Sequence, residues 1–206
     1  MVFPTKTYDS AGEYAHDYFS AYAQAAQTVD RHQIDEAAKV LAAAYESRGS
    51  VFACGNGGSA SISNHFLCDH IKGVRTDTNL RPKVISLVAN MEIITAIAND
   101  IDYADVFAYQ LESLASQGDI LVTVSSSGNS ENIVRAMACA KSHGMTTIAL
   151  TSFDGGRSRE MADISLHVDT HNYGIAEDVH QSIMHALAQF LRMSHLETPF
   201  SPTLQF

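Results

Sequence analysis

Short apolar runs alternate with longer helical patterns along most of the chain. Each run is rich in β-branched residues and almost continuously apolar, which is typical of strands buried on both faces of a parallel sheet. The runs predict strands at residues 50–54, 84–89, 119–125, 146–152 and 164–169. The intervening patterns predict helices at 59–72, 91–115, 130–142 and 157–162, and a last long helix at 176–195. This alternation, with short connections, predicts right-handed crossovers and a doubly wound α/β sandwich.

Residues 10–48 precede the first strand and have the periodicity of two amphipathic helices, broken near residues 30–33. Ser10 and Asp30 are suitable N-caps for them. The last residues contain two prolines and are expected to lie over the surface or another chain. At 206 residues the chain has the length of one domain. We expect a single domain over 1–206, with N-terminal helices at 10–48, an α/β core at 50–195 and a tail at 196–206.

Composition narrows the class of protein. The chain has 13 Lys+Arg against 23 Asp+Glu, a formal charge of −10, which argues against nucleic-acid or anionic-membrane binding. Its three cysteines have no metal-binding spacing, and no signal peptide or long apolar span is present, so we expect a soluble, cytoplasmic protein. Only 17% of residues are charged, which suggests that other subunits cover some helix faces.

The first strand of the core runs into a glycine-rich turn, Gly-Asn-Gly-Gly-Ser-Ala at residues 55–60. Ligands of such sheets bind beyond the carboxyl ends of the strands, and glycines let the backbone approach an anion. The turn resembles a dinucleotide fingerprint, but the next strand ends near Ala89 and Asn90 without the required acidic residue. Nicotinamide binding is therefore disfavoured, and a tight turn without a ligand stays an alternative.

A second turn follows the third strand, with the sequence Ser-Ser-Ser-Gly-Asn-Ser at residues 125–130. Hydroxyls, a glycine and the start of a helix together can hold a phosphate without positive side chains. Serines are also common in ordinary turns and caps. No Gly-Lys-Ser/Thr sequence is present, which disfavours ATP hydrolysis.

Two helices carry candidate acid–base or metal-binding residues. His65 and Asp69 are spaced i, i+4 and share a helix face, which suits an acid/base pair, two metal ligands or a surface ion pair. Glu177 and His185 are eight residues apart, about 80° around and roughly 12 Å along an ideal helix. That is poor ligand geometry unless Glu177 lies in a frayed first turn. Asn99 and Asp100 offer hydrogen bonds to sugar hydroxyls, although such residues are ordinary at helix ends.

Taken together and in this order, these segments resemble the SIS (sugar isomerase) domain and, within it, the phosphoheptose isomerase group. The resemblance covers about residues 10–195. It implies a three-layer sandwich with a five-stranded parallel sheet, and a homotetramer with active sites shared between subunits. It also implies isomerisation of sedoheptulose 7-phosphate to D-glycero-D-manno-heptose 7-phosphate for bacterial surface-polysaccharide (lipopolysaccharide) heptose, with Zn²⁺ in several members.

By position, the resemblance implies site residues of three kinds. The phosphate end should meet Ser59, Ser125, Ser126, Ser127 and Ser130, and the sugar path should be lined by Asn56, Gly57, Gly58, Asn99 and Asp100. One Zn²⁺ per subunit would be held by His65, Asp69, Glu177 and His185, and the catalytic residues would be Asp69, Glu177 and His185. This chain has Asp69 where the family typically has glutamate, and Glu177 where it typically has glutamine. Acid/base duty is therefore open between Asp69 and Glu177.

Two other functions remain open beside the heptose isomerase, and a third is disfavoured. One is a non-catalytic SIS module that binds phosphosugars or a replication initiator, and another is an isomerase of a different sugar phosphate. Retention of His65, Asp69, Glu177 and His185 together favours an enzyme. An aminosugar isomerase lacks support, since no lysine lies near the strand-end turns.

Overall fold

A five-stranded parallel sheet forms the centre of the computed structural model, which describes residues 1–205. The strand order is β2-β1-β3-β4-β5, and every pairing is parallel. The strands are β1 (Ser50–Gly55), β2 (Lys83–Ser86), β3 (Ile120–Val124), β4 (Thr146–Thr151) and β5 (Ile164–His167). The expected α/β class and five-stranded parallel sheet are confirmed.

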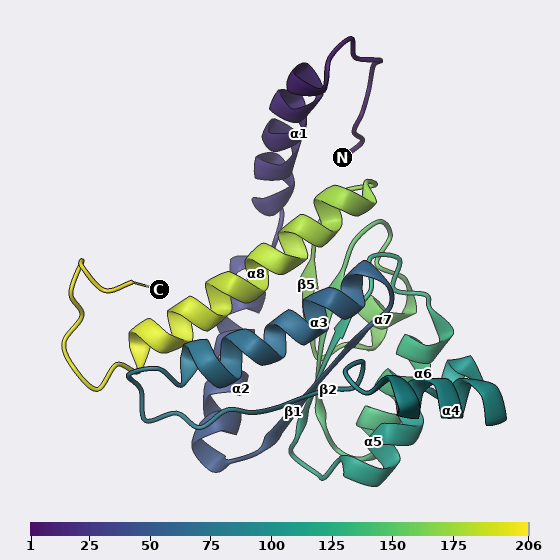
Figure 1. Ribbon diagram of the computed structural model, residues 1–206, viewed down its shortest axis with the longest axis vertical. Coiled ribbons are helices and arrows are strands. Elements are labelled where there is room, and N and C mark those ends of the chain that lie inside the picture. Colours follow the sequence, from purple (N-terminus) through teal and green to yellow (C-terminus); the bar gives the residue numbers. More distant parts are fainter. Residues whose placement is uncertain (206) are drawn as a thin grey trace.

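Helices cover both faces of the sheet (Figure 1). One face carries α1 (Ala11–Ala26), α2 (Arg31–Ser47), α3 (Gly58–Cys68) and α8 (Tyr173–Ser194), and the other carries α4 (Met91–Asp100), α5 (Ala108–Leu114), α6 (Glu131–Ser142) and α7 (Gly156–Met161). Side chains alternate across a strand, so Val51 and Ala53 of β1 join the first core cluster whereas Phe52 and Cys54 join the second. Burial of both strand faces explains the continuous apolar runs.

The N-terminal helices break between Ala26 and Arg31, with the expected N-caps. Ser10 Oγ accepts the Glu13 amide at 3.2 Å, and Asp30 Oδ1 accepts the His32 amide at 2.9 Å. Helix α1 packs on α8, and its N-terminal end extends past the body of the molecule (Figure 1).

The structure corrects two of the expected helices. The single helix expected at 91–115 is divided into α4, the 3₁₀ turn η2 (Tyr103–Asp105) and α5. Asp102 is extended and accepts the Ala104 amide at 3.0 Å, so it caps a new turn and ends the helical run. The helix expected at 59–72 is α-helical only to Cys68 and continues as the π-helical turn η1 (Asp69–Val74).

The start of the tail pairs with the segment that follows η1, and the rest extends as a loop beyond the end of α8 (Figure 1). Leu196 bridges Thr78 in antiparallel fashion, and the Glu197 amide donates to Asp77 O at 2.9 Å. The final tail residue, Phe206, is outside the described residues. Among residues 1–205, no helix combines the length and apolar character needed to cross a membrane.

Candidate active site

A polar cavity of about 150 Å³ lies where β1 and β3 end. These strands are neighbours, with Gly55 opposite Val124, so the two glycine- and serine-containing turns that follow them meet at one edge of the sheet. The cavity is lined by Asn56, Ser59, Val124, Ser125, Ser126, Ser127, Ser130, Tyr173 and Glu177. The structure thus brings together Asn56 and all the serines expected to bind phosphate.

The serine loop, residues 125–130, is held by close contacts with the start of α7. Gly128 has φ +64°, and its carbonyl oxygen accepts both the Ser158 amide and the Ser158 hydroxyl at 2.9 Å. A Cβ at Gly128 would overlap the carbonyl oxygen of Gly155, so only glycine fits here. The Ser126 hydroxyl is buried and has no hydrogen-bond partner among the described residues. A buried unpaired hydroxyl is costly unless a ligand pairs it, so the loop is suited to bind an oxyanion.

A second group of polar side chains forms a compact cluster of His65, Asp69 and His185. Asp69 Oδ1 lies 3.1 Å from His65 Nε2 and its Oδ2 lies 3.3 Å from His185 Nε2, while the two imidazole nitrogens are 3.2 Å apart. The Gln181 amide contacts His185 Nε2 at 3.1 Å. His65 of α3 and Asp69, the first residue of η1, therefore form the expected close i, i+4 pair, and α8 adds the second histidine.

The donor atoms of this cluster fit a zinc ion. Nitrogen and oxygen ligands at about 2.1 Å in a tetrahedral arrangement lie roughly 3.4 Å from one another. The distances here are 3.1–3.3 Å, and two imidazoles with one carboxylate are a common ligand set for zinc. Three protein ligands leave a fourth position for another ligand.

Glu177 is not part of this three-residue cluster in the described chain. It lies in the second turn of α8, lines the serine cavity, and sits so close to Gly58 that a Cβ there would overlap its carboxylate. Burial, and then the neighbouring charge of Asp178, raise the pKa of the Glu177 carboxyl. Of the four expected metal ligands the structure thus groups three, and it places the fourth, Glu177, beside the serines.

The remaining expected sugar-binding residues lie outside this cavity's lining. Asn99 Nδ2 donates to Asp100 Oδ1 at 2.7 Å, and both are exposed at the end of α4. Gly57, at φ +56°, is the N-cap of α3. Sequence reasoning missed Tyr173, which lines the cavity one helical turn before Glu177. Tyr173 is four residues before Glu177, and this i, i+4 spacing could have predicted that the two side chains share a helix face.

The chain has clear relatives. The SIS domain family matches residues 13–152. A phosphoheptose isomerase of Aliarcobacter butzleri is 35% identical over 79% of this chain and 86% of its own length. One of Helicobacter pylori is 34% identical over 76% of this chain and 81% of its own length.

A solved structure of a phosphoheptose isomerase has the same fold as this chain. The phosphoheptose isomerase of Francisella tularensis has a TM-score of 0.81 and 31% identity, over 89% of this chain and 98% of that one. The family model covers the serine loop, and relatives at 31–35% identity cover most of the chain, so the chain belongs to the SIS domain family and, within it, to the phosphoheptose isomerases.

Proposed function

We propose that this protein is an isomerase that converts sedoheptulose 7-phosphate to D-glycero-D-manno-heptose 7-phosphate. The observation that carries the proposal is the shared cavity, in which an unpaired buried Ser126 hydroxyl and the Glu177 carboxyl lie together. A phosphate held at the serines would position the remainder of the chain for reaction, because remote binding lowers the entropic cost of alignment. Family membership supports the same substrate.

Aldose–ketose isomerisation moves a proton between adjacent carbons through a cis-enediol. The raised pKa of Glu177 suits it to take a proton from one carbon and return it to the next. Asp69 is held between two imidazoles, so Glu177 is the freer of the two candidate bases. His185, on the same helix as Glu177, turns its Nε2 toward Asp69 and His65, so we assign it to metal binding and leave proton transfer to Glu177.

We further propose Zn²⁺ as the cofactor, held by His65, Asp69 and His185. When bound, it would supply Lewis-acid polarisation of the substrate carbonyl. Metal analysis of chelator-treated and zinc-reloaded protein tests this directly. We expect about one zinc per chain after reloading, and loss of that zinc in His65→Ala but not in His16→Ala, an exposed histidine on α1. Equal zinc content in both variants would contradict the assignment.

We propose that the whole chain is one SIS domain that assembles as a homotetramer in the cytoplasm and supplies surface-polysaccharide heptose. Phe19 on α1 is 66% exposed and Phe190 on α8 is 49% exposed, which supports burial of these helices in an assembly. The free thiols Cys54, Cys68 and Cys139 are compatible with a reducing compartment. Light scattering after size exclusion measures the assembly. A monomer at micromolar concentration would contradict it.

The activity test is incubation of zinc-loaded protein with sedoheptulose 7-phosphate, followed by NMR of the aldose product. We expect turnover that falls by about 10²-fold or more in His185→Ala, because the variant lacks a ligand of the proposed zinc, and is unchanged in His16→Ala. Protection against heat without turnover would point to another sugar phosphate. Neither turnover nor protection would favour the non-catalytic SIS module.

A further inference from the structure

Asn56, at the wall of the serine cavity, is held by two residues outside its own loop. Its amide pairs reciprocally with Asn132 of α6, with both N–H···O distances at 2.9 Å. Its oxygen also accepts the hydroxyl of Tyr103, on η2, at 2.8 Å. Asn132 is 2% exposed, so this amide pair is anchored in the core.

These contacts use most of the hydrogen-bonding capacity of the Asn56 side chain. Its Oδ1 accepts two hydrogen bonds and one N–H donates to Asn132, which leaves a single N–H without a partner among residues 1–205. The reciprocal pair ties the Asn56 amide to a single residue, Asn132. The Tyr103 hydroxyl adds a third hydrogen bond, from η2, which restrains the position of that amide.

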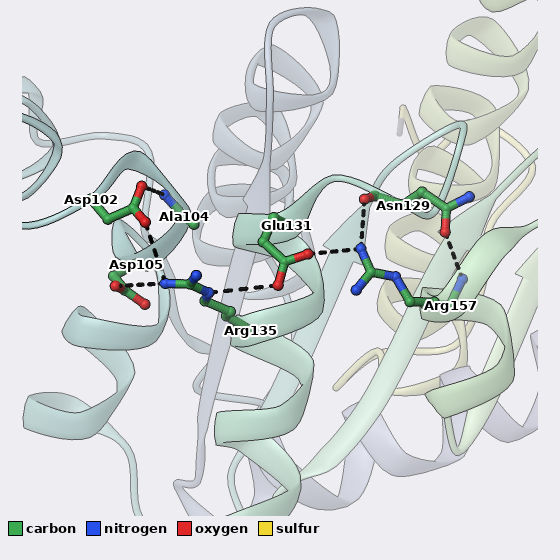
Figure 2. Close-up of polar contacts among 7 residues, drawn as sticks. All are labelled: Asp102, Ala104, Asp105, Asn129, Glu131, Arg135 and Arg157. Carbon is green, nitrogen blue, oxygen red and sulfur yellow. Dashed lines mark hydrogen bonds and ion pairs between the residues drawn. The ribbon is translucent and has the colours of Figure 1, made fainter.

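Tyr103 is in turn held by an ion-pair network that Figure 2 shows. Arg135 Nη1 lies 2.8 Å from Asp105 and 3.6 Å from Asp102, the residues that end and cap η2. Glu131 then connects Arg135 to Arg157, whose guanidinium donates to the backbone oxygen of Asn129 in the serine loop at 3.1 Å (Figure 2). A continuous series of ion pairs and one hydrogen bond thus connects η2, which carries Tyr103, with the serine loop.

We propose that Tyr103 is a positioning residue, which orients Asn56 so that its free N–H donates to an oxygen of the bound sugar phosphate. Arg135 acts one step further away, by holding the η2 turn that carries Tyr103. The inference rests on the proposed function, since it takes the serine cavity as the substrate site. It does not require Tyr103, which is 54% exposed, to touch the substrate.

The test compares Tyr103→Phe with Tyr109→Phe, a control on α5 whose side chain is also about half exposed. Both changes keep the ring and remove only a hydroxyl. For Tyr103→Phe we expect KM for sedoheptulose 7-phosphate to rise about threefold to tenfold, the scale of one neutral hydrogen bond. We expect kcat within about twofold of wild type, and no change in Tyr109→Phe.

A double-mutant cycle separates positioning from direct contact. If Tyr103 acts through Asn56, then Tyr103→Phe adds nothing to KM once Asn56→Ala is present. Equal effects of Tyr103→Phe in the two backgrounds would overturn the inference. Arg135→Gln should raise KM as well. Lys141→Gln is the control, because Lys141 is on the same helix as Arg135 and its 3.0 Å ion pair to Asp163 is also lost, but KM should not change.

The outcomes distinguish this inference from the proposed function. Wild-type turnover with an unaltered KM in Tyr103→Phe would overturn the positioning role and leave the isomerase intact. Failure of the wild type to turn over or bind sedoheptulose 7-phosphate would overturn both.

Discussion

Asp69 and Glu177 are the two carboxylates of the site, and their surroundings differ. Asp69 lies between the imidazoles of His65 and His185, at 3.1 and 3.3 Å. Glu177 lines the serine cavity and has a raised pKa because of burial and the neighbouring Asp178. A carboxylate between two imidazoles is suited to hold a cation, and a half-buried free carboxyl is suited to exchange protons.

Glu177→Gln tests this difference between the two carboxylates, because glutamine has nearly the shape of glutamate but carries no carboxylate. We expect kcat to fall by about 10²-fold or more, since the variant keeps the shape but cannot accept a proton. The ionised carboxylate is the active base, so wild-type activity should be lost as pH falls through the raised pKa, above the ordinary glutamate range. A pH–rate profile measures this. Full activity of Glu177→Gln would transfer the role to Asp69, and Asp69→Asn would then be inactive.

The serine loop works at the scale of an element, since its shape depends on the start of α7. The Gly128 carbonyl accepts two hydrogen bonds from Ser158, and Gly156 packs against the carbonyl of Ser127. These contacts hold the serine hydroxyls around the cavity before any ligand arrives, which lowers the ordering cost of binding.

Gly128→Ala is expected to disrupt this loop, because its Cβ would overlap the Gly155 carbonyl at a positive φ. We expect KM for the phosphorylated substrate to rise by tenfold or more, measured with matched protein concentrations. Gly118→Ala is the control: Gly118 also has a positive φ, of +88°, but its Cβ would meet open space. A similar rise of KM in both variants would indicate general destabilisation instead of a loop effect.

At the scale of the whole molecule, two histidines are buried in the core on the α8 side of the sheet. His70 is bonded to the Tyr45 hydroxyl at 2.6 Å, and His180 to the backbone oxygen of Thr151 at 3.1 Å. Burial lowers the pKa of His70 to about 3 and that of His180 to about 4. Both are therefore neutral in the fold near neutral pH, whereas unfolded histidine protonates near pH 6.5.

We predict that these histidines make the fold sensitive to acid. Their contribution to the free energy of unfolding is complete above about pH 6.5 and is lost progressively as pH falls toward their folded pKa values, because only the unfolded chain binds the protons. Two such groups give a slope of up to about 2.7 kcal/mol per pH unit. Urea unfolding of chelator-treated protein between pH 5 and 6.5 measures it. His180→Gln should reduce the slope by about half and His16→Gln should not; an unchanged slope in both would contradict the prediction.

The sheet, its helical layers and the two turns that build the serine cavity follow from patterns within the sequence. Buried parallel strands, caps and glycine turns are local patterns, and neighbouring parallel strands end at one edge, so Asn56 and the serines could be placed together. Which distant side chains meet depends instead on how the elements pack on one another. His185 reaches His65 and Asp69, and Glu177 lies apart from them, because of how α8 packs on α3. The end of α4, after which η2 brings Tyr103 to Asn56, could not be predicted from the sequence either, because the helical periodicity of 91–115 continues through it. Distances between elements depend on packing across the core, which the period of a single element does not record.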